Sequence, residues 1–204
     1  KDVHFSFAPL NDDAFIASGL YQEGRFCLLK DSGMKKEYFV DYPSRDEAEK
    51  TVTNQIKAQA YSGNLVVHPS GNQFMFCTRN ADMLSFYTYK NDKILLTKGI
   101  DKTFPDYKYD NETKRFSGFS AYSPVGYLYA CGTEKNVYLL YSGKSYAEAG
   151  DKAFISSQIE VYNWEGEKVK TLMLDIPIKS MVVSEDDKTV YAISMNPEPQ
   201  IVAF

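Results

Sequence analysis

A polar turn followed by a short apolar strand recurs four times along the chain, and few folds accommodate such a repeat. The turns fall at residues 11–13, 70–73, 134–136 and 186–188, and the strands predicted after them at 14–18, 74–78, 137–141 and 189–194. With Phe15, Phe74, Val137 and Val190 taken as equivalent, the spacings are 59, 63 and 53 residues. A period of this length, filled with short strands, is typical of the blades of a β-propeller.

Each repeat predicts an antiparallel meander of up to four strands. First strands are expected at 3–8, 64–68, 126–131 and 178–183, third strands at 25–30, 84–89, 159–163 and 201–204, and fourth strands at 37–40, 93–97 and 168–174. The last repeat stops at its third strand. Because a closed propeller usually completes its last blade with an N-terminal strand, we expect a partial ring whose missing strands precede residue 1.

Four stretches of the chain resemble the TolB-like six-bladed propeller proteins. They read AYSGNLVVHPSGN (60–72), YLLYSGKS (138–145), IEVYNWEG (159–166) and MNPEP (195–199). The resemblance covers about residues 60–204, and it implies envelope lipoproteins with six blades. The expected fold is therefore all-β, a propeller of four-stranded antiparallel blades with about four of six blades present. We expect one domain over 1–204, with repeats at roughly 1–43, 61–99, 125–175 and 176–204.

Three long insertions, at 41–63, 100–125 and 142–158, are predicted on one face of the propeller. They join second to third strands or one blade to the next, and such connections share a face. The first is expected to hold a short helix near residues 44–60. Ser44 and Glu47 have the spacing of a capping box, and Ala48, Val52 and Ile56 would share one side of the helix.

Repeat proteins carry variable loops on their working face, so we predict binding there. Aromatic and cationic side chains of this face suit contact with a protein or a glycan. The candidate binding residues are Tyr42, Arg45, Arg79, Tyr107, Tyr109, Arg115, Lys144 and Tyr146. The alternative is that the insertions only cover blade edges.

No complete catalytic, nucleotide or metal motif is present in the sequence. Gly143, Lys144 and Ser145 resemble the end of a phosphate-binding loop, but position 138 is Tyr where that loop needs glycine. His4 and His68 leave few possible bases for a serine triad. We therefore assign no catalytic residue, no metal ligand and no cofactor.

Three cysteines, Cys27, Cys77 and Cys131, lack metal-ligand spacing. We expect small, buried strand residues, and a Cys77–Cys131 bridge remains open. The net charge of −4 gives no reason to expect nucleic acid as a partner.

The leading hypothesis is a non-enzymatic binding module of the cell envelope, periplasmic or surface-exposed, that uses the insertion-bearing face. We expect a membrane attachment only through a lipid anchor upstream of this chain, and self-association through open blade edges. The alternative is an enzyme acting on glycans in the central channel, and a third hypothesis is a structural spacer.

Overall fold

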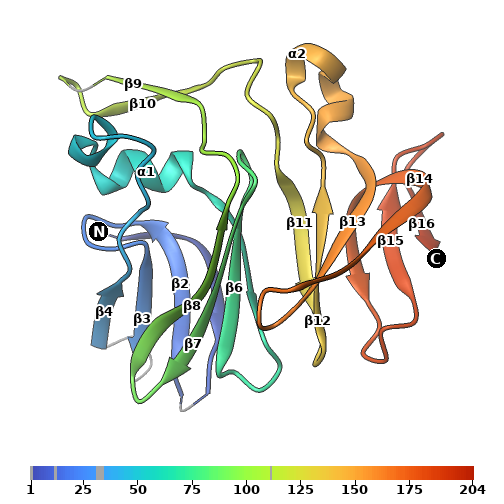
Figure 1. Cartoon of the computed structure of the whole chain (residues 1–204), viewed down its shortest axis with the longest axis horizontal. Coiled ribbons are helices and arrows are strands. Elements are labelled where there is room, and N and C mark those ends of the chain that lie inside the picture. The colour runs from blue at the N-terminus through green and yellow to red at the C-terminus, as the bar shows by residue number, and fades with distance from the viewer. Residues whose placement is uncertain (1, 12, 31–34, 111) are drawn as a thin grey trace.

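The computed structural model describes residues 2–11, 13–30, 35–110 and 112–204 (Figure 1). Asp12, part of the first predicted turn, lies outside the described residues. The described chain is built from antiparallel sheets with two short α-helices, which confirms the all-β prediction. No helix among the described residues is long and apolar enough to cross a membrane.

Two four-stranded meanders form the N-terminal half of the structure. Neighbouring strands pair antiparallel in chain order, as expected for blades. The first sheet is β1 (Val3–Pro9), β2 (Phe15–Leu20), β3 (Phe26–Lys30) and β4 (Lys35–Phe39). The second is β5 (Gly63–Val67), β6 (Gln73–Thr78), β7 (Met83–Lys90) and β8 (Lys93–Asp101).

The C-terminal half is one continuous six-stranded sheet that corresponds to two predicted repeats. Its strands are β11 (Tyr127–Gly132), β12 (Asn136–Tyr141), β13 (Ser156–Asn163), β14 (Lys168–Val183), β15 (Val190–Ser194) and β16 (Gln200–Ala203). The first half of β14 pairs with β13, and the second half pairs with β15. One long strand is thus the fourth strand of the third blade and the first strand of the next.

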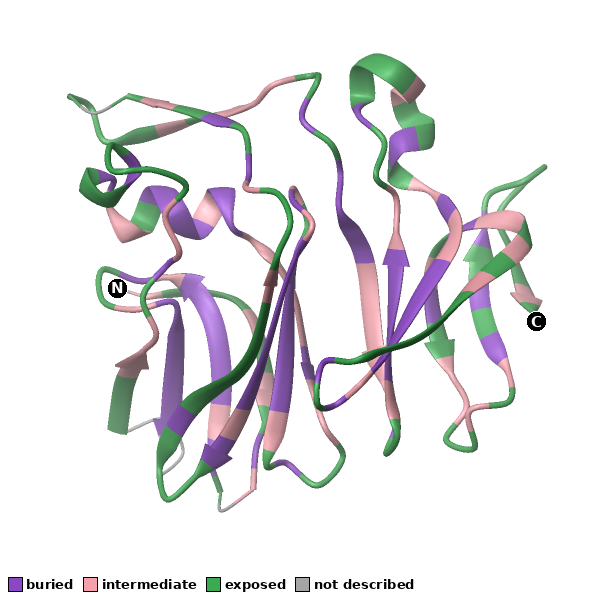
Figure 2. Ribbon diagram, in the orientation of Figure 1, coloured by how far each residue is buried: buried purple, intermediate pink, exposed green. Residues whose placement is uncertain are grey.

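The cores lie between consecutive blades, where Figure 2 shows the buried strand segments. Between the first two blades, the ring of Phe26 meets Phe74, Phe76 and Tyr87 edge-on at 5.2–5.5 Å between centroids. First strands lie beside one another, since β1 contacts β5, β5 contacts β11, and β11 contacts β14. Face-to-face packing of apolar strands therefore joins the blades.

Polar turns between first and second strands also connect each blade to the next. The Asn11 amide donates to the Gly71 carbonyl (3.1 Å), and His68 Nε2 donates to the Glu134 carbonyl (3.1 Å). Between the last two blades, the Thr133 hydroxyl donates to Asp187 Oδ1 (2.7 Å). The predicted turns therefore connect the blades as well as reversing the chain.

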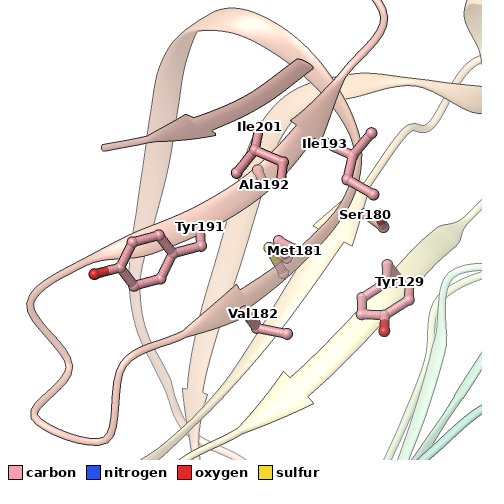
Figure 3. A pocket seen from close by; sticks show the side chains of 8 residues that line it. All are labelled: Tyr129, Ser180, Met181, Val182, Tyr191, Ala192, Ile193 and Ile201. Carbon is pink, nitrogen blue, oxygen red and sulfur yellow. The ribbon is translucent and has the colours of Figure 1, made fainter. Parts of the chain in front are cut away.

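The outer face of the last blade is apolar and exposed, and Figure 3 shows the side chains that line a pocket on it. Val182, Tyr191, Ile193 and Ile201 point from β14, β15 and β16 into a shallow pocket of about 310 Å³. Ile201 is 82% exposed. This surface has the composition of the faces that pack between blades elsewhere in the chain.

The first insertion folds differently from its predicted capping pattern. A 3₁₀ turn (Glu49–Thr51) precedes α1 (Asn54–Ala60), and Val52 between them is extended with ψ 134°. Asp46 Oδ1 accepts the Glu49 amide hydrogen bond (2.8 Å), so a short turn forms where the helix was expected to begin. Ser44 instead accepts a hydrogen bond from Lys57 Nζ (3.0 Å). A helix is present but shorter than predicted: the capping box at Ser44 is wrong, and Ala48 and Val52 lie outside the helix, so they share no helical face with Ile56.

All three cysteines are free, and no Cys77–Cys131 bridge forms. Cys27 and Cys77 are buried in β3 and β6, and Cys131 is partly buried in β11. Burial raises the thiol pKa of Cys77 to about 12. They are therefore small packed residues of the strands.

Candidate functional site

The three insertions gather at one end of the sheets, at the top of Figure 1. They form α1, the hairpin β9 (Tyr107–Asp110) and β10 (Arg115–Phe119), and α2 (Tyr146–Ala149). We call these three segments together the insertion layer. α1 contacts both β10 and β2, so the layer rests on the first blade.

A buried carboxylate joins the first insertion to the second. Glu49 is 1% exposed, and its Oε1 accepts a hydrogen bond from the Tyr107 hydroxyl (2.7 Å). Its Oε2 accepts from the Tyr61 hydroxyl (3.0 Å) and from the Arg45 amide. Burial, with Glu49 as a further cause, raises the pKa of both phenols far above the usual value. Both tyrosines therefore stay protonated and keep donating to Glu49.

A backbone hydrogen bond joins the second insertion to the third. The Ala147 amide in α2 donates to the Ala121 carbonyl (2.8 Å). α2 begins with a capping box, since the Glu148 amide donates to Ser145 Oγ (3.3 Å) and the Ser145 amide donates to Glu148 Oε2 (3.0 Å). The insertion layer is therefore a connected structure rather than three independent loops.

The predicted binding residues divide by exposure. Tyr42 and Tyr107 are 8% and 5% exposed and belong to an apolar cluster beneath the layer. Tyr109 is partly buried beside Tyr107, at 5.7 Å between ring centroids. The remaining residues are exposed: Arg45, Arg79, Arg115, Lys144 and Tyr146. The two buried tyrosines support the layer from below, and the exposed residues are available for contact.

Arg79 is the predicted residue that lines a concavity. With Phe5, Gln59, Ser62, Gly63 and Asn64 it borders a pocket of about 340 Å³. We call this the mouth pocket, because it lies where the first strands β1 and β5 meet the insertion layer. Sequence reasoning missed Phe5 and Gln59, since no local signal connects a β1 residue to a helix more than 50 positions later.

Backbone contacts hold Arg79 in place while its side chain stays open. The Arg79 amide donates to the Ser62 carbonyl (2.9 Å), and its carbonyl accepts from the Gly126 amide (2.7 Å). Within the described chain the guanidinium forms no ion pair. Phe5 opposite is 47% exposed. A guanidinium, amides, a hydroxyl and an aromatic ring together can bind hydroxyl and carboxylate groups and stack on a flat apolar face.

A second concavity lies at the start of α1. It measures about 510 Å³ and is lined by Gln22, Val52, Thr53, Asn54, Gln55 and Lys114. Asn54 Nδ2 donates to the Gln22 carbonyl (3.2 Å), which fixes that amide. The polar side of α1 thus carries a row of amide groups between Arg79 and Lys114.

Two carboxylates approach one hydroxyl between the second and third blades. The Tyr127 hydroxyl donates to Asp82 Oδ1 (2.6 Å) and lies 3.4 Å from Glu160 Oε2. Lys102 pairs with Asp82 (3.1 Å), and Lys168 pairs with Glu160 (2.6 Å). Neither carboxylate lines the mouth pocket or the second concavity. This network joins two blades, and each of its carboxylates is already paired with a lysine.

The geometry above defines a class of protein. Successive four-stranded antiparallel meanders, with first strands side by side and cores between the sheets, make the chain a β-propeller protein. It belongs to the TolB-like 6-blade propeller-like family, whose model matches residues 2–186. This result confirms the family resemblance noted from the sequence.

Solved structures resemble the chain in fold. The Myceliophteria thermophila Cps50 (Swd1) β-propeller domain aligns with TM-score 0.57 at 8% identity, covering 100% of this chain and 51% of that one. A periplasmic gluconolactonase of Pseudomonas aeruginosa aligns with TM-score 0.58 at 11% identity, covering 100% and 50%. Hydrazine synthase of Kuenenia stuttgartiensis aligns with TM-score 0.53 at 15% identity, covering 98% of this chain and 45% of that one. The chain thus spans about half the length of these proteins. A search of curated protein sequences finds no significant match.

Proposed function

We propose that the chain is a non-catalytic binding module of the cell envelope that holds a glycan at the mouth pocket. The observation that carries the proposal is that Arg79, whose guanidinium forms no ion pair in the described chain, and the exposed Phe5 line the same concave site. Aromatic rings stack on the apolar faces of sugars, while amide and guanidinium groups form hydrogen bonds with the sugar hydroxyls. The row of amides on α1 extends the same chemistry beyond the mouth pocket.

The family supports an envelope location, because TolB-like proteins are typically periplasmic. The upstream lipid anchor stays a prediction. The concave mouth pocket also favours a binding module over a spacer, whose insertions would pack down flat.

A glycan microarray with matched variants tests the proposal. We expect the wild-type chain to bind a defined subset of glycans, and Arg79→Ala and Phe5→Ala to lose that binding. Lys93→Ala, an exposed charge on β8 outside the mouth pocket, is the control and should bind normally. Binding that survives both substitutions would place the site elsewhere. The absence of any glycan hit, with an envelope protein captured through Arg79, would favour a protein partner.

The enzymatic alternative rests on Asp82 and Glu160 at one hydroxyl. Their lysine partners and the hydrogen bond of Asp82 with Tyr127 across two blades argue for a structural role. The gluconolactonase among the similar structures shares only the fold with this chain. Mass spectrometry of each bound glycan after incubation separates the two functions, since any change of mass would contradict a non-catalytic module.

A further inference from the structure

A second kind of concavity lies away from the insertion layer, between the last two blades. It measures about 470 Å³, within the range of small-molecule sites. Its apolar walls are formed by Leu172, Leu174, Val183, Val190 and Phe204, and four charged residues also line it: Asp175, Asp187, Lys170 and Lys188. We call it the interblade pocket. A concavity with apolar walls and two carboxylates calls for a ligand with matching chemistry.

Asp187 has one oxygen committed and one free. Its Oδ1 accepts hydrogen bonds from the Thr133 hydroxyl (2.7 Å), the Tyr138 hydroxyl (2.7 Å) and Asn136 Nδ2 (3.4 Å). Its Oδ2 is buried and has no hydrogen-bond partner among the described residues. A buried polar atom without a partner is uncommon and costs free energy, so Oδ2 is a ready acceptor.

The backbone at Asp187 also indicates a use for this side chain. Its φ is +60°, and the equivalent turn of the second blade has Gly71 at φ +73°. In both turns the amide donates to the carbonyl three residues earlier, Ser184 or His68. Glycine is the ordinary choice at positive φ, and a strained residue persists where its side chain has a role. Asp187 Oδ1 makes the hydrogen bond that joins the two blades, whereas Oδ2 makes no hydrogen bond with the described residues.

Asp187 is ionised at neutral pH. Burial opposes ionisation, yet hydrogen bonds from Thr133, Tyr138 and Asn136, with the charge of Lys135 nearby, hold the pKa below its usual range. Of the lysines around the pocket, Lys188 is paired with Asp186 at 3.2 Å. Lys170 is exposed, so water and salt screen its charge. Asp175 is exposed as well, so the charge of Asp187, whose Oδ2 is buried, acts most strongly inside the pocket.

We propose that the interblade pocket binds an organic monocation, a primary ammonium group carried on an apolar body. The ammonium donates to Asp187 Oδ2, and the apolar body packs against Leu172, Val190 and Phe204. Hydrogen bonds between ionised groups are shorter and stronger than neutral ones. A divalent metal ion fits poorly, because calcium takes six to eight oxygens and the two carboxylates of the pocket offer at most three uncommitted ones.

Access to Oδ2 requires one wall side chain to move. Met173 lines the pocket, is 71% exposed, and is unbranched with flexible torsions. We expect displacement of Met173 to expose the carboxylate to the ligand.

Calorimetric titration with 2-phenylethylammonium chloride tests the proposal, with 2-phenylethanol as the neutral analogue. We expect the ammonium to bind at least about tenfold more tightly than the alcohol, because only the ammonium forms a hydrogen bond between two charged groups with Asp187. Asp187→Asn keeps an Oδ1 acceptor and tolerates positive φ, and should lose the preference. Glu185→Gln removes a charge from the same turn outside the pocket and should retain it.

Three results would overturn the proposal: no binding of the ammonium, equal affinity for both probes, or an unchanged preference in Asp187→Asn. If Asp187→Asn does not fold, wild-type NMR decides instead. Contacts between the probe's aromatic protons and the methyl groups of Leu172 and Val190 are required, and their absence would equally rule out the site.

Discussion

The hydroxyl of Tyr107 donates a hydrogen bond to Glu49 Oε1 at 2.7 Å, although 58 positions separate the two residues. Glu49 belongs to the first insertion and Tyr107 to the second. With Tyr61 on the other carboxylate oxygen, this contact makes the two insertions one structure.

Replacement of Glu49 by alanine should loosen the insertion layer. Two buried hydroxyls would lose a charged acceptor, so the free energy of unfolding should fall by about 2 to 3 kcal/mol. Urea denaturation measures the change. Glu47→Ala, which removes an exposed carboxylate on the same segment, should leave stability essentially unchanged. Equal effects in the two variants would show that Glu49 has no special role.

Replacement of Gly71 by alanine should weaken the contact between the first two blades. The residue has φ +73°, and an added Cβ would lie 2.5 Å from the Asn11 backbone nitrogen. We expect a loss of about 1 to 3 kcal/mol from strain at this backbone conformation. Gly99→Ala, where a Cβ meets nothing within 4 Å, should instead raise stability by about 0.5 to 1 kcal/mol. Thermal unfolding of both variants checks the contrast in sign.

The stability of the protein at low pH should depend on Asp187. Its pKa in the folded protein is lowered, so its ionised form stabilises the fold above the unfolded-state pKa of about 3.9. That contribution is lost as pH falls through the lower folded-state pKa. The wild-type chain should therefore lose stability relative to Asp187→Asn as pH falls from about 5 towards 2. Denaturation midpoints of both chains across this range measure the difference, and parallel curves would contradict the prediction.

The three thiols should resist alkylation until the protein unfolds. Burial raises the pKa of Cys27 and Cys131 to about 11 and of Cys77 to about 12, which leaves little thiolate at pH 8. Mass spectrometry after iodoacetamide treatment should show no rapid labelling of Cys77 in the folded protein. Unfolding without reductant should expose three reactive thiols. Only one would react if Cys77 and Cys131 formed a bridge.

The apolar outer face of the last blade should promote self-association. Ile201, 82% exposed on the last strand of its sheet, is the most exposed part of this surface. Ile201→Lys should weaken association at least about tenfold, because it removes one large apolar contact. Val169→Lys, at a 54% exposed position on β14, is the control. Sedimentation across a concentration series tests this, and a strictly monomeric wild-type chain would rule it out.

Local patterns in the sequence carried most of the information about the fold. Turns with Asn, Asp and Gly before short apolar runs predicted strands such as β6 and β12 to within a residue of their observed bounds. The capping pattern at Ser44 failed, because a 3₁₀ turn forms there instead, with the Glu49 amide donating to Asp46 Oδ1. Alternation and turn chemistry depend on neighbours in the chain, which a sequence shows directly.

The sites depended on the tertiary structure. The sequence singled out Arg79, but only packing brought it beside Phe5, and only packing buried Tyr42 and Tyr107. The spacing of residues along the chain also does not predict that Asp187 bonds to Thr133 and keeps one oxygen without a partner among the described residues. The sequence determined which segments become strands and turns, because those preferences are local. Which side chains meet, which are buried and which keep an unused hydrogen bond depends on how blades pack across 50 or more positions, and the tertiary structure decided that.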